Sequence, residues 1–310
     1  MKYALINGIL LDGTETMQPR PGLTVLVNGD RIEALVPAGD EGAGYEKIDL
    51  SGGYVMPGLI NLHVHLPASG RPTVKQKDTK KIVCLMTSNA LLRAITFRVC
   101  AGYAKTELLS GVTTLRSVGG IQAVDSCLRD KILSGKAVGP RILAGNMAVS
   151  VPGGHMAGSL PYAMFDRSVT GASETEQYNG KLVMDGIIDC AKACLKNGIP
   201  VGLGTDTGCP YITHYDMRRE VYYFHKFCGV TNAFALHTAT LGNARLVGLG
   251  AETGSLEPDK CADLIVTRAN PLEDLKALRH IDLVMGRGNL IRAPKVKKIE
   301  KAERELDKFL

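Results

Sequence analysis

The chain has no tryptophan, and only 5% of its 310 residues are aromatic. No apolar run approaches the roughly 18 residues needed to span a membrane. The apolar stretch at the amino terminus ends at a predicted turn at Asn7-Gly8. It is therefore too short for the apolar region of a secretory signal peptide. Internal repeats and low-complexity tracts are also lacking. These absences favour a cytoplasmic globular protein with no membrane partner.

A basic motif interleaved with aromatic residues, which is typical of nucleic-acid binding, is absent as well. The net charge is +6, but much of the excess lies in residues 71–81 and 292–301. A solvated face or a terminal helix accounts for such runs, so we expect no nucleic-acid partner. The Lys-, Arg- and Glu-rich tail after Pro294 is interpreted as loosely attached.

The eight cysteines form no closely spaced disulfide framework. Only Cys190 and Cys194 are near each other, on one face of a helix predicted over 181–197. A zinc or redox pair is the alternative, but we expect reduced thiols that are mostly buried as small apolar residues. Cys209 either borders a site at Asp206 or packs within its loop.

The most informative segment is 55–65, Val-Met-Pro-Gly-Leu-Ile-Asn-Leu-His-Val-His. It has the apolar character of a buried strand, and side chains two apart on a strand point the same way. His63 and His65 therefore face one direction, and neutral imidazole is the commonest transition-metal ligand. A pair of surface or hydrogen-bonded histidines is the alternative.

A partner is predicted at Asp206, in Val-Gly-Leu-Gly-Thr-Asp-Thr-Gly over 201–208. A carboxylate at the carboxyl end of a parallel strand is where α/β barrels place catalytic groups. The alternative is that Asp206 caps a turn or the next helix. If His63, His65 and Asp206 converge, they form a metal site with three protein ligands.

Together these segments resemble the amidohydrolase superfamily, in the metal-dependent hydrolase branch that includes imidazolonepropionases and Xaa-Pro dipeptidase-like enzymes. Further matching segments cover nearly the whole chain: 7–13, 27–32, 111–119, Pro152-Gly-Gly-His155, 237–240, 243–244 and 254–265. The resemblance implies a metal site of His63, His65 and Asp206, most commonly with zinc. It also implies that Asp206 acts as the catalytic proton carrier and that His155 faces the substrate. Local bonding within a glycine-rich loop is the alternative for His155.

One departure is important. The family places a lysine on its fourth barrel strand and histidines on the fifth and sixth, and this chain has no room for those strands between residues 159 and 181. A complete barrel needs about 250 residues. We predict four barrel strands, over 59–64, 112–118, 141–149 and 201–206. Their open edges make a homo-oligomer possible.

The predicted fold is α/β: an incomplete (β/α)8 TIM-barrel-type domain over 57–251, shortened near 159–181, and a small β-sandwich built from 1–56 and 252–310. The predicted helices span 85–109, 123–133, 181–197, 216–227 and 232–240, the last capped by Thr231. His225 and His237 lie on helices and are expected to be structural. His214, beyond Asp206, could approach the pocket.

Two functions remain open from the sequence. One is metal-dependent hydrolysis of carbon–nitrogen bonds in a cyclic amide, an N-acyl amino acid or an Xaa-Pro-like dipeptide. The other is a catalytically impaired remnant with a binding role or no activity. A mononuclear deaminase is disfavoured, because the resemblance implies that it also needs the missing histidine of the fifth strand.

Overall fold

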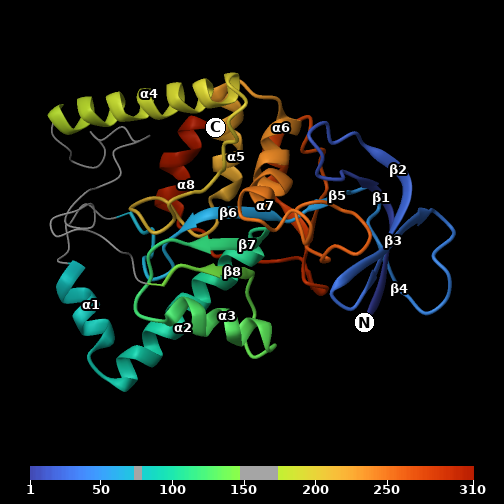
Figure 1. Ribbon diagram of the computed structural model, residues 1–310, viewed down its shortest axis with the longest axis horizontal. Coiled ribbons are helices and arrows are strands. Elements are labelled where there is room, and N and C mark those ends of the chain that lie inside the picture. The colour runs from blue at the N-terminus through green and yellow to red at the C-terminus, as the bar shows by residue number, and fades with distance from the viewer. Residues whose placement is uncertain (73–78, 147–173) are drawn as a thin grey trace.

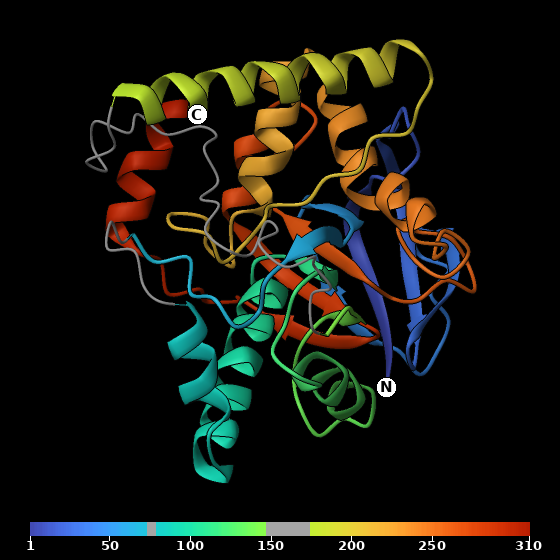
Figure 2. The ribbon, with the colours of Figure 1, turned by 60° about the vertical axis from the view of Figure 1, so that its left-hand side comes forward.

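The computed structural model describes residues 1–72, 79–146 and 174–310. Strands from both ends of the chain form one sheet, in the order β11-β10-β9-β5-β1-β2-β3, with β4 paired to β1. Figure 2 shows the red carboxyl-terminal strands beside the blue amino-terminal ones. The bounds are β1 Lys2–Leu10, β2 Arg20–Asn28, β3 Arg31–Pro37, β4 Glu46–Asp49, β5 Tyr54–Pro57, β9 Leu264–Thr267, β10 Ile281–Gly286 and β11 Asn289–Arg292.

This shared sheet confirms that the two ends of the chain meet. The junction is the antiparallel pair β5 and β9, where Pro57 lies opposite Leu264. One face of the sheet buries its own apolar cluster, to which Leu5, Val27 and Met285 belong. The topology is that of one sheet; the β-sandwich, which requires a second facing sheet, stays a prediction.

A separate parallel sheet holds β6 Leu59–Val64, β7 Val112–Ser117 and β8 Arg141–Ala144 in that order. Its first strand is apolar and buried along nearly its whole length, as parallel central strands are. In Figure 1 these strands lie between two groups of helices, α2 and α3 on one side and α4 to α7 on the other. Three of the four predicted barrel strands are thereby confirmed, although β8 ends at Ala144.

The fourth predicted strand, 201–206, is not a regular strand. It runs beside β6, because Leu62 N–H donates to Leu203 O over 3.1 Å and Asp206 N–H donates to His63 O over 3.0 Å. The ladder is interrupted because the side-chain oxygen of Asn61 accepts the Thr205 N–H at 3.1 Å. Within the described residues the four segments form an open arc, and no closed barrel is present.

The predicted helices are present, but several bounds differ: the helix predicted over 181–197 begins at Glu174, and two larger corrections are described below. The described helices are α1 Thr79–Thr87, α2 Ala90–Leu109, α3 Val124–Leu133, α4 Glu174–Lys196, α5 Met217–Cys228, α6 Asn232–His237, α7 Asn243–Leu246 and α8 Glu300–Leu306, with a π turn at Thr238–Gly242 and 3-10 turns at Leu275–Arg279 and Asp307–Phe309. None is long and apolar enough to cross a membrane.

The single helix predicted over 85–109 is the first correction, since it is two helices. Asn89 has extended backbone angles, and its side chain accepts the Leu92 N–H, which caps α2. The predicted cap at Thr231 is confirmed, because its hydroxyl accepts the Phe234 N–H. The π turn that follows ends α6 three residues before the predicted end.

The carboxyl-terminal tail is the second correction, because α8 is firmly docked. Glu303 accepts hydrogen bonds from Arg218, Arg219 and Arg279, and the last two also bind Asp307. Arg219 is only 1% exposed. The Lys- and Glu-rich composition predicted a solvated tail, but the acidic side chains on its inner face pair with arginines from distant elements.

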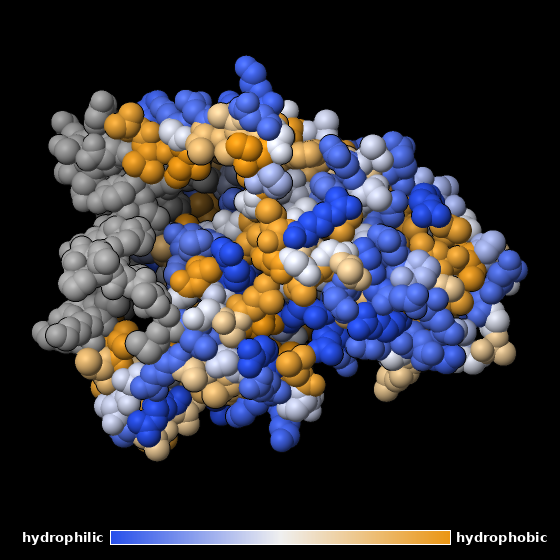
Figure 3. All heavy atoms as spheres, viewed as in Figure 1, coloured by the Kyte–Doolittle hydropathy of each residue, from blue (hydrophilic) through white to orange (hydrophobic). Residues whose placement is uncertain are grey.

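The apolar residues on α4 are unusually exposed for a globular protein. Leu182, Val183 and Ile187 have relative exposures of 61%, 45% and 55%, and Figure 3 shows apolar atoms along the outer surface of this helix. A helix next to a complete parallel sheet would bury such a stripe. The exposure agrees with the open arc that the described residues form.

An acid-sensitive ion pair lies in the terminal sheet. The Glu41 carboxylate accepts the Gly39 backbone N–H at 2.9 Å and binds Lys47 at 3.0 Å, and these contacts lower its pKa from 4.5 to about 2. A carboxyl with a lowered pKa stabilises the fold above its unfolded value, and that contribution is lost as pH falls from 4.5 to about 2. We expect Glu41→Gln to lower the unfolding midpoint at pH 7. The difference from wild type should shrink as chemical unfolding is measured from pH 5 down to pH 2.5, and a constant difference would contradict the assignment.

Candidate metal centre

Three predicted ligands converge at the carboxyl end of the arc. His63 and His65 extend from β6, and Asp206 ends the neighbouring segment. The Asp206 Oδ1 atom is 3.3 Å from His63 Nε2 and 3.1 Å from His65 Nε2, and the two Nε2 atoms are 3.3 Å apart. Among the described residues this is the group of His, Cys, Asp and Glu side chains that could hold a metal ion. The predicted convergence is confirmed.

Backbone pairing fixes this arrangement. Asp206 N–H donates to His63 O, and His65 N–H donates to Thr207 O at 2.9 Å, so the two segments are held in register at the site. Asp206 has a φ of +55°, a left-handed conformation that Asp tolerates better than most residues. This bend turns its carboxylate toward the histidines.

The second ring nitrogen of His65 is already engaged. Its Nδ1 lies 3.2 Å from Gly119 O, in the loop after β7. A carbonyl can only accept, so Nδ1 carries a proton, and Nε2 is the ring nitrogen left to bind a metal ion. Such a contact behind the ring orients metal-binding histidines in general.

The spacing fits a metal ion. Zinc bonds of about 2.0–2.2 Å at tetrahedral angles place neighbouring ligand atoms about 3.3–3.6 Å apart. The three observed separations of 3.1 to 3.3 Å lie at or just below the short end of this range, and both imidazole nitrogens and a carboxylate oxygen are ligands that zinc accepts. The residues present therefore fit a single divalent ion with at least one open position.

Electrostatics tie the three groups together. The hydrogen bond from His65 lowers the pKa of Asp206, and the same bond raises the pKa of His65. The Cys209 Sγ atom lies 3.6 Å from Asp206 Oδ2. Burial raises the pKa of Cys209 to about 12, so its thiol keeps the proton at neutral pH. Cys209 thus borders the site, as one of its two interpretations had it.

The remaining histidines do not join the centre. His214 is 2% exposed and has both ring nitrogens engaged, with Nδ1 3.3 Å from Glu107 and Nε2 2.8 Å from Ala68 O. His225 and His237 bind backbone carbonyls, as expected of structural residues. His155, the predicted substrate-facing residue, lies outside the described residues. All eight cysteines are free thiols.

One supporting residue was missed. Asn61 is fully buried two positions before His63, and its amide donates to Thr205 Oγ1 at 2.9 Å. Asn61, His63 and His65 are spaced two residues apart on one strand, so their side chains share a face. The spacing could therefore have identified Asn61 as well.

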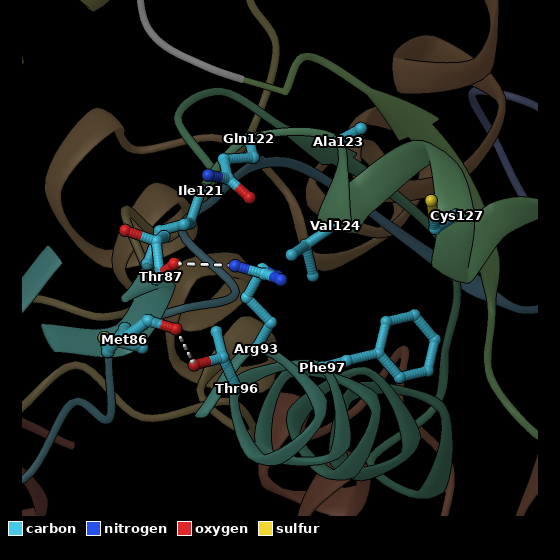
Figure 4. A pocket seen from close by; sticks show the side chains of 10 residues that line it. All are labelled: Met86, Thr87, Arg93, Thr96, Phe97, Ile121, Gln122, Ala123, Val124 and Cys127. Atoms are coloured by element: carbon cyan, nitrogen blue, oxygen red, sulfur yellow. Dashed lines mark hydrogen bonds between the residues drawn. The ribbon is translucent and has the colours of Figure 1, made fainter. Parts of the chain in front are cut away.

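A cavity of about 190 Å³ lies between the start of α2 and the start of α3. Figure 4 shows Phe97 and Val124 on its wall and the Arg93 guanidinium bound to the Thr87 carbonyl. None of the lining residues is His63, His65 or Asp206, so this cavity is separate from the candidate centre.

Comparison with known proteins agrees with the geometry. Residues 181–291 match the model of the amidohydrolase family. An imidazolonepropionase of Myxococcus xanthus is 41% identical over 61 residues, which span only 18% of this chain and 14% of that protein. An imidazolonepropionase of Thermoplasma acidophilum is 20% identical over 366 aligned positions, covering 86% of this chain and 88% of that protein. Since the alignment has more positions than the chain has residues, part of that relative has no counterpart here.

A crystal structure of a candidate prolidase from Bifidobacterium longum has a TM-score of 0.84 and 24% identity, covering 99% of this chain and 98% of that one. This likeness concerns the fold, and it places the parallel arc within a TIM-barrel-type domain. The family segment, the relatives and the His-His-Asp cluster agree with the motifs read from the sequence. These findings support the assignment of the chain to the amidohydrolase superfamily, whose family model matches residues 181–291, with an open arc in place of a closed barrel over the described residues.

Proposed function

We propose that His63, His65 and Asp206 hold one divalent ion, zinc by their chemistry, and that the chain hydrolyses carbon–nitrogen bonds at this centre. The observation that carries the proposal is the set of three ligand-atom separations, 3.1 to 3.3 Å. A bound ion of this kind lowers the pKa of water toward neutrality and polarises a substrate carbonyl.

The side chains have distinct roles in this proposal. His63 and His65 are ligands, and the Gly119 carbonyl keeps the His65 ring in the orientation that presents Nε2. Asp206 orients the attacking water, accepts its proton and passes it to the leaving nitrogen, as a positioned carboxylate can. His155 is the proposed substrate contact.

The proposed substrate class is a cyclic amide, an N-acyl amino acid or an Xaa-Pro-like dipeptide. Its support is the match of residues 181–291 to the amidohydrolase family, together with the names of two similar proteins, an imidazolonepropionase and a candidate prolidase. The second candidate function is a catalytically impaired remnant with a binding role. The open arc favours this second function. Within the described residues the cluster consists of three ligands, without the lysine and the two further histidines that the family resemblance would add.

Metal titration tests the centre. After chelator treatment, we expect the protein to bind about one Zn²⁺ or Co²⁺ per chain, more weakly than complete barrels do, because each missing ligand removes donor atoms from the ion. His63→Ala or His65→Ala should abolish binding. His280→Ala, at an exposed histidine elsewhere, is the matched control. Equal binding by wild type and both site variants would contradict the proposal.

Hydrolysis assays separate the two functions. We expect slow metal-dependent turnover of imidazolonepropionate, N-acyl amino acids or Xaa-Pro dipeptides, measured with and without added zinc. Stoichiometric metal binding without turnover on any of these substrates would favour the impaired remnant.

A further inference from the structure

Glu107, near the end of α2, is a fully buried carboxyl group that contacts side chains from two other parts of the chain. Its Oε1 atom lies 3.3 Å from His214 Nδ1, and its Oε2 atom accepts the Asn61 amide at 3.4 Å. Asn61 belongs to β6, and His214 lies in the loop between Asp206 and α5. A buried carboxyl group costs stability unless its oxygens are paired. Here each oxygen is paired, and each partner leads to the candidate metal centre.

Asn61 connects Glu107 to the segment that carries Asp206. The Asn61 amide donates to Thr205 Oγ1 at 2.9 Å, and its side-chain oxygen accepts the Thr205 N–H at 3.1 Å. Thr205 directly precedes Asp206, so this amide holds the segment against β6 where the backbone ladder is interrupted. A flipped amide would turn its oxygen toward Oε2 of Glu107, which repels it. Glu107 therefore fixes the orientation in which the amide can hold Thr205.

His214 connects Glu107 to the loop on the other side of Asp206. His214 Nε2 lies 2.8 Å from the carbonyl oxygen of Ala68, which can only accept, so Nε2 donates. Ala68 N–H in turn donates to His65 O at 3.1 Å, in the turn that follows the two histidines of the centre. The His214 ring also stacks on Tyr103 of α2, with ring centroids 4.4 Å apart. The loop after Asp206 is thus bound both to α2 and to the turn after β6.

The conformation of Asp206 requires such support. Its φ of +55° is in the left-handed region, and a residue other than glycine stays there when surrounding contacts impose it. Asn61 restrains the residue before Asp206, and His214 restrains the loop after it. Both restraints end on the carboxyl group of Glu107.

We infer that Glu107 is a positioning residue for the candidate metal centre. Through Asn61 and His214, it holds the Asp206 carboxylate opposite the two histidine ligands. Outer contacts that orient ligands typically contribute about 10- to 100-fold in metal affinity. The role depends on two hydrogen bonds and not on charge: the bond to His214 needs one proton, which either group can carry. This inference rests on the proposed metal site.

Two substitutions separate this role from one of charge. Glu107→Gln keeps the length of the side chain and both contacts, because its amide oxygen accepts from Asn61 and its amide N–H donates to Nδ1 of a neutral His214. Glu107→Leu has a similar size and removes both contacts. The inference therefore predicts that glutamine preserves the centre and that leucine does not.

The test is Co²⁺ titration of the full chain followed by visible absorption, which reports the ligands around the ion, together with thermal unfolding of each metal-free variant. We expect Glu107→Leu to weaken Co²⁺ binding about tenfold or more. Its spectrum at saturating Co²⁺ should approach that of Asp206→Ala, because the Asp206 carboxylate is no longer held in place. Glu107→Gln should keep the wild-type affinity and spectrum. Leu5→Ala, in the apolar cluster of the terminal sheet, is the matched control: it should lower the unfolding midpoint and change neither affinity nor spectrum.

Wild-type affinity in Glu107→Leu, or weakened binding with a wild-type spectrum, would overturn the inference. Equal losses in Glu107→Gln and Glu107→Leu would also overturn it, since charge would then be what matters. If Glu107→Leu does not fold, His214→Phe decides between the same outcomes, because it keeps a ring against Tyr103 and removes the bond to Glu107. Wild-type protein that binds no Co²⁺, or an Asp206→Ala variant that binds it as wild type does, would instead refute the proposed metal site, and the inference with it.

Discussion

Asp206→Asn is expected to remove metal-dependent hydrolysis, with activity falling to the level of metal-free protein. The substitution keeps the shape of the side chain and can keep the φ of +55° that Asn tolerates. It removes the charge that binds both histidines and the group that accepts a proton. Loss of a general base alone costs about 10²- to 10⁴-fold in rate, and loss of the charged ligand weakens the metal as well.

Two measurements check this prediction. Rates are compared at saturating zinc, which isolates the proton-transfer role, and metal affinity is measured by Co²⁺ titration. Cys209→Ala is the control, because it removes the neighbouring thiol without touching the three ligand atoms; we expect near wild-type behaviour. If Asp206→Asn retained wild-type rates at saturating zinc, another group would be the proton carrier.

Arg219→Ala is expected to cause the largest loss of stability, about 3–5 kcal/mol in the free energy of unfolding. Arg219 is 1% exposed and binds Asp216, Glu303 and Asp307 at once. Removing it leaves the buried Asp216 without its ion-pair partner and takes one arginine from Glu303 and Asp307, on which the docking of α8 depends. We expect earlier proteolytic cleavage in the tail as well.

The comparison is Arg129→Ala, whose partner Asp130 is exposed. A surface pair of this kind contributes about 0–1 kcal/mol, so chemical unfolding should separate the two variants clearly. An Arg219→Ala loss below 1 kcal/mol would mean that Arg218 and Arg279 hold the tail without it.

The parts of the structure that the sequence predicted correctly depend on local patterns. His63 and His65 share a face because of strand periodicity, and Asp206 was placed by its position at a strand end. The alternation of apolar and turn residues at both ends predicted strands that then share a sheet. The break at Asn89 was also local, and the Ser-Asn pair before an apolar run was a cap signal that could have been used.

The features that were missed depend on contacts between residues far apart in sequence. Glu303 reads as part of a solvated tail, yet its partners Arg218 and Arg219 lie 85 and 84 residues away. Asn61 reads as an ordinary polar residue in a strand until Thr205, 144 residues on, is placed beside it. Composition describes the average environment of such residues and cannot identify a partner on another element.

The pairing of β5 with β9 has a consequence for how this chain can change length. Pro57 and Leu264 lie opposite each other, and Gly58 N–H donates to Asp263 O at 3.0 Å, so the parallel arc begins and the chain rejoins the terminal sheet side by side, after a return segment that also bonds to Asp12, Asp30 and Ile32. The parallel arc is thus an insertion at what would otherwise be a hairpin. Segments can be lost or gained within it without changing the register of any strand pair in the terminal sheet. The closure of the terminal sheet is therefore independent of the length of the arc.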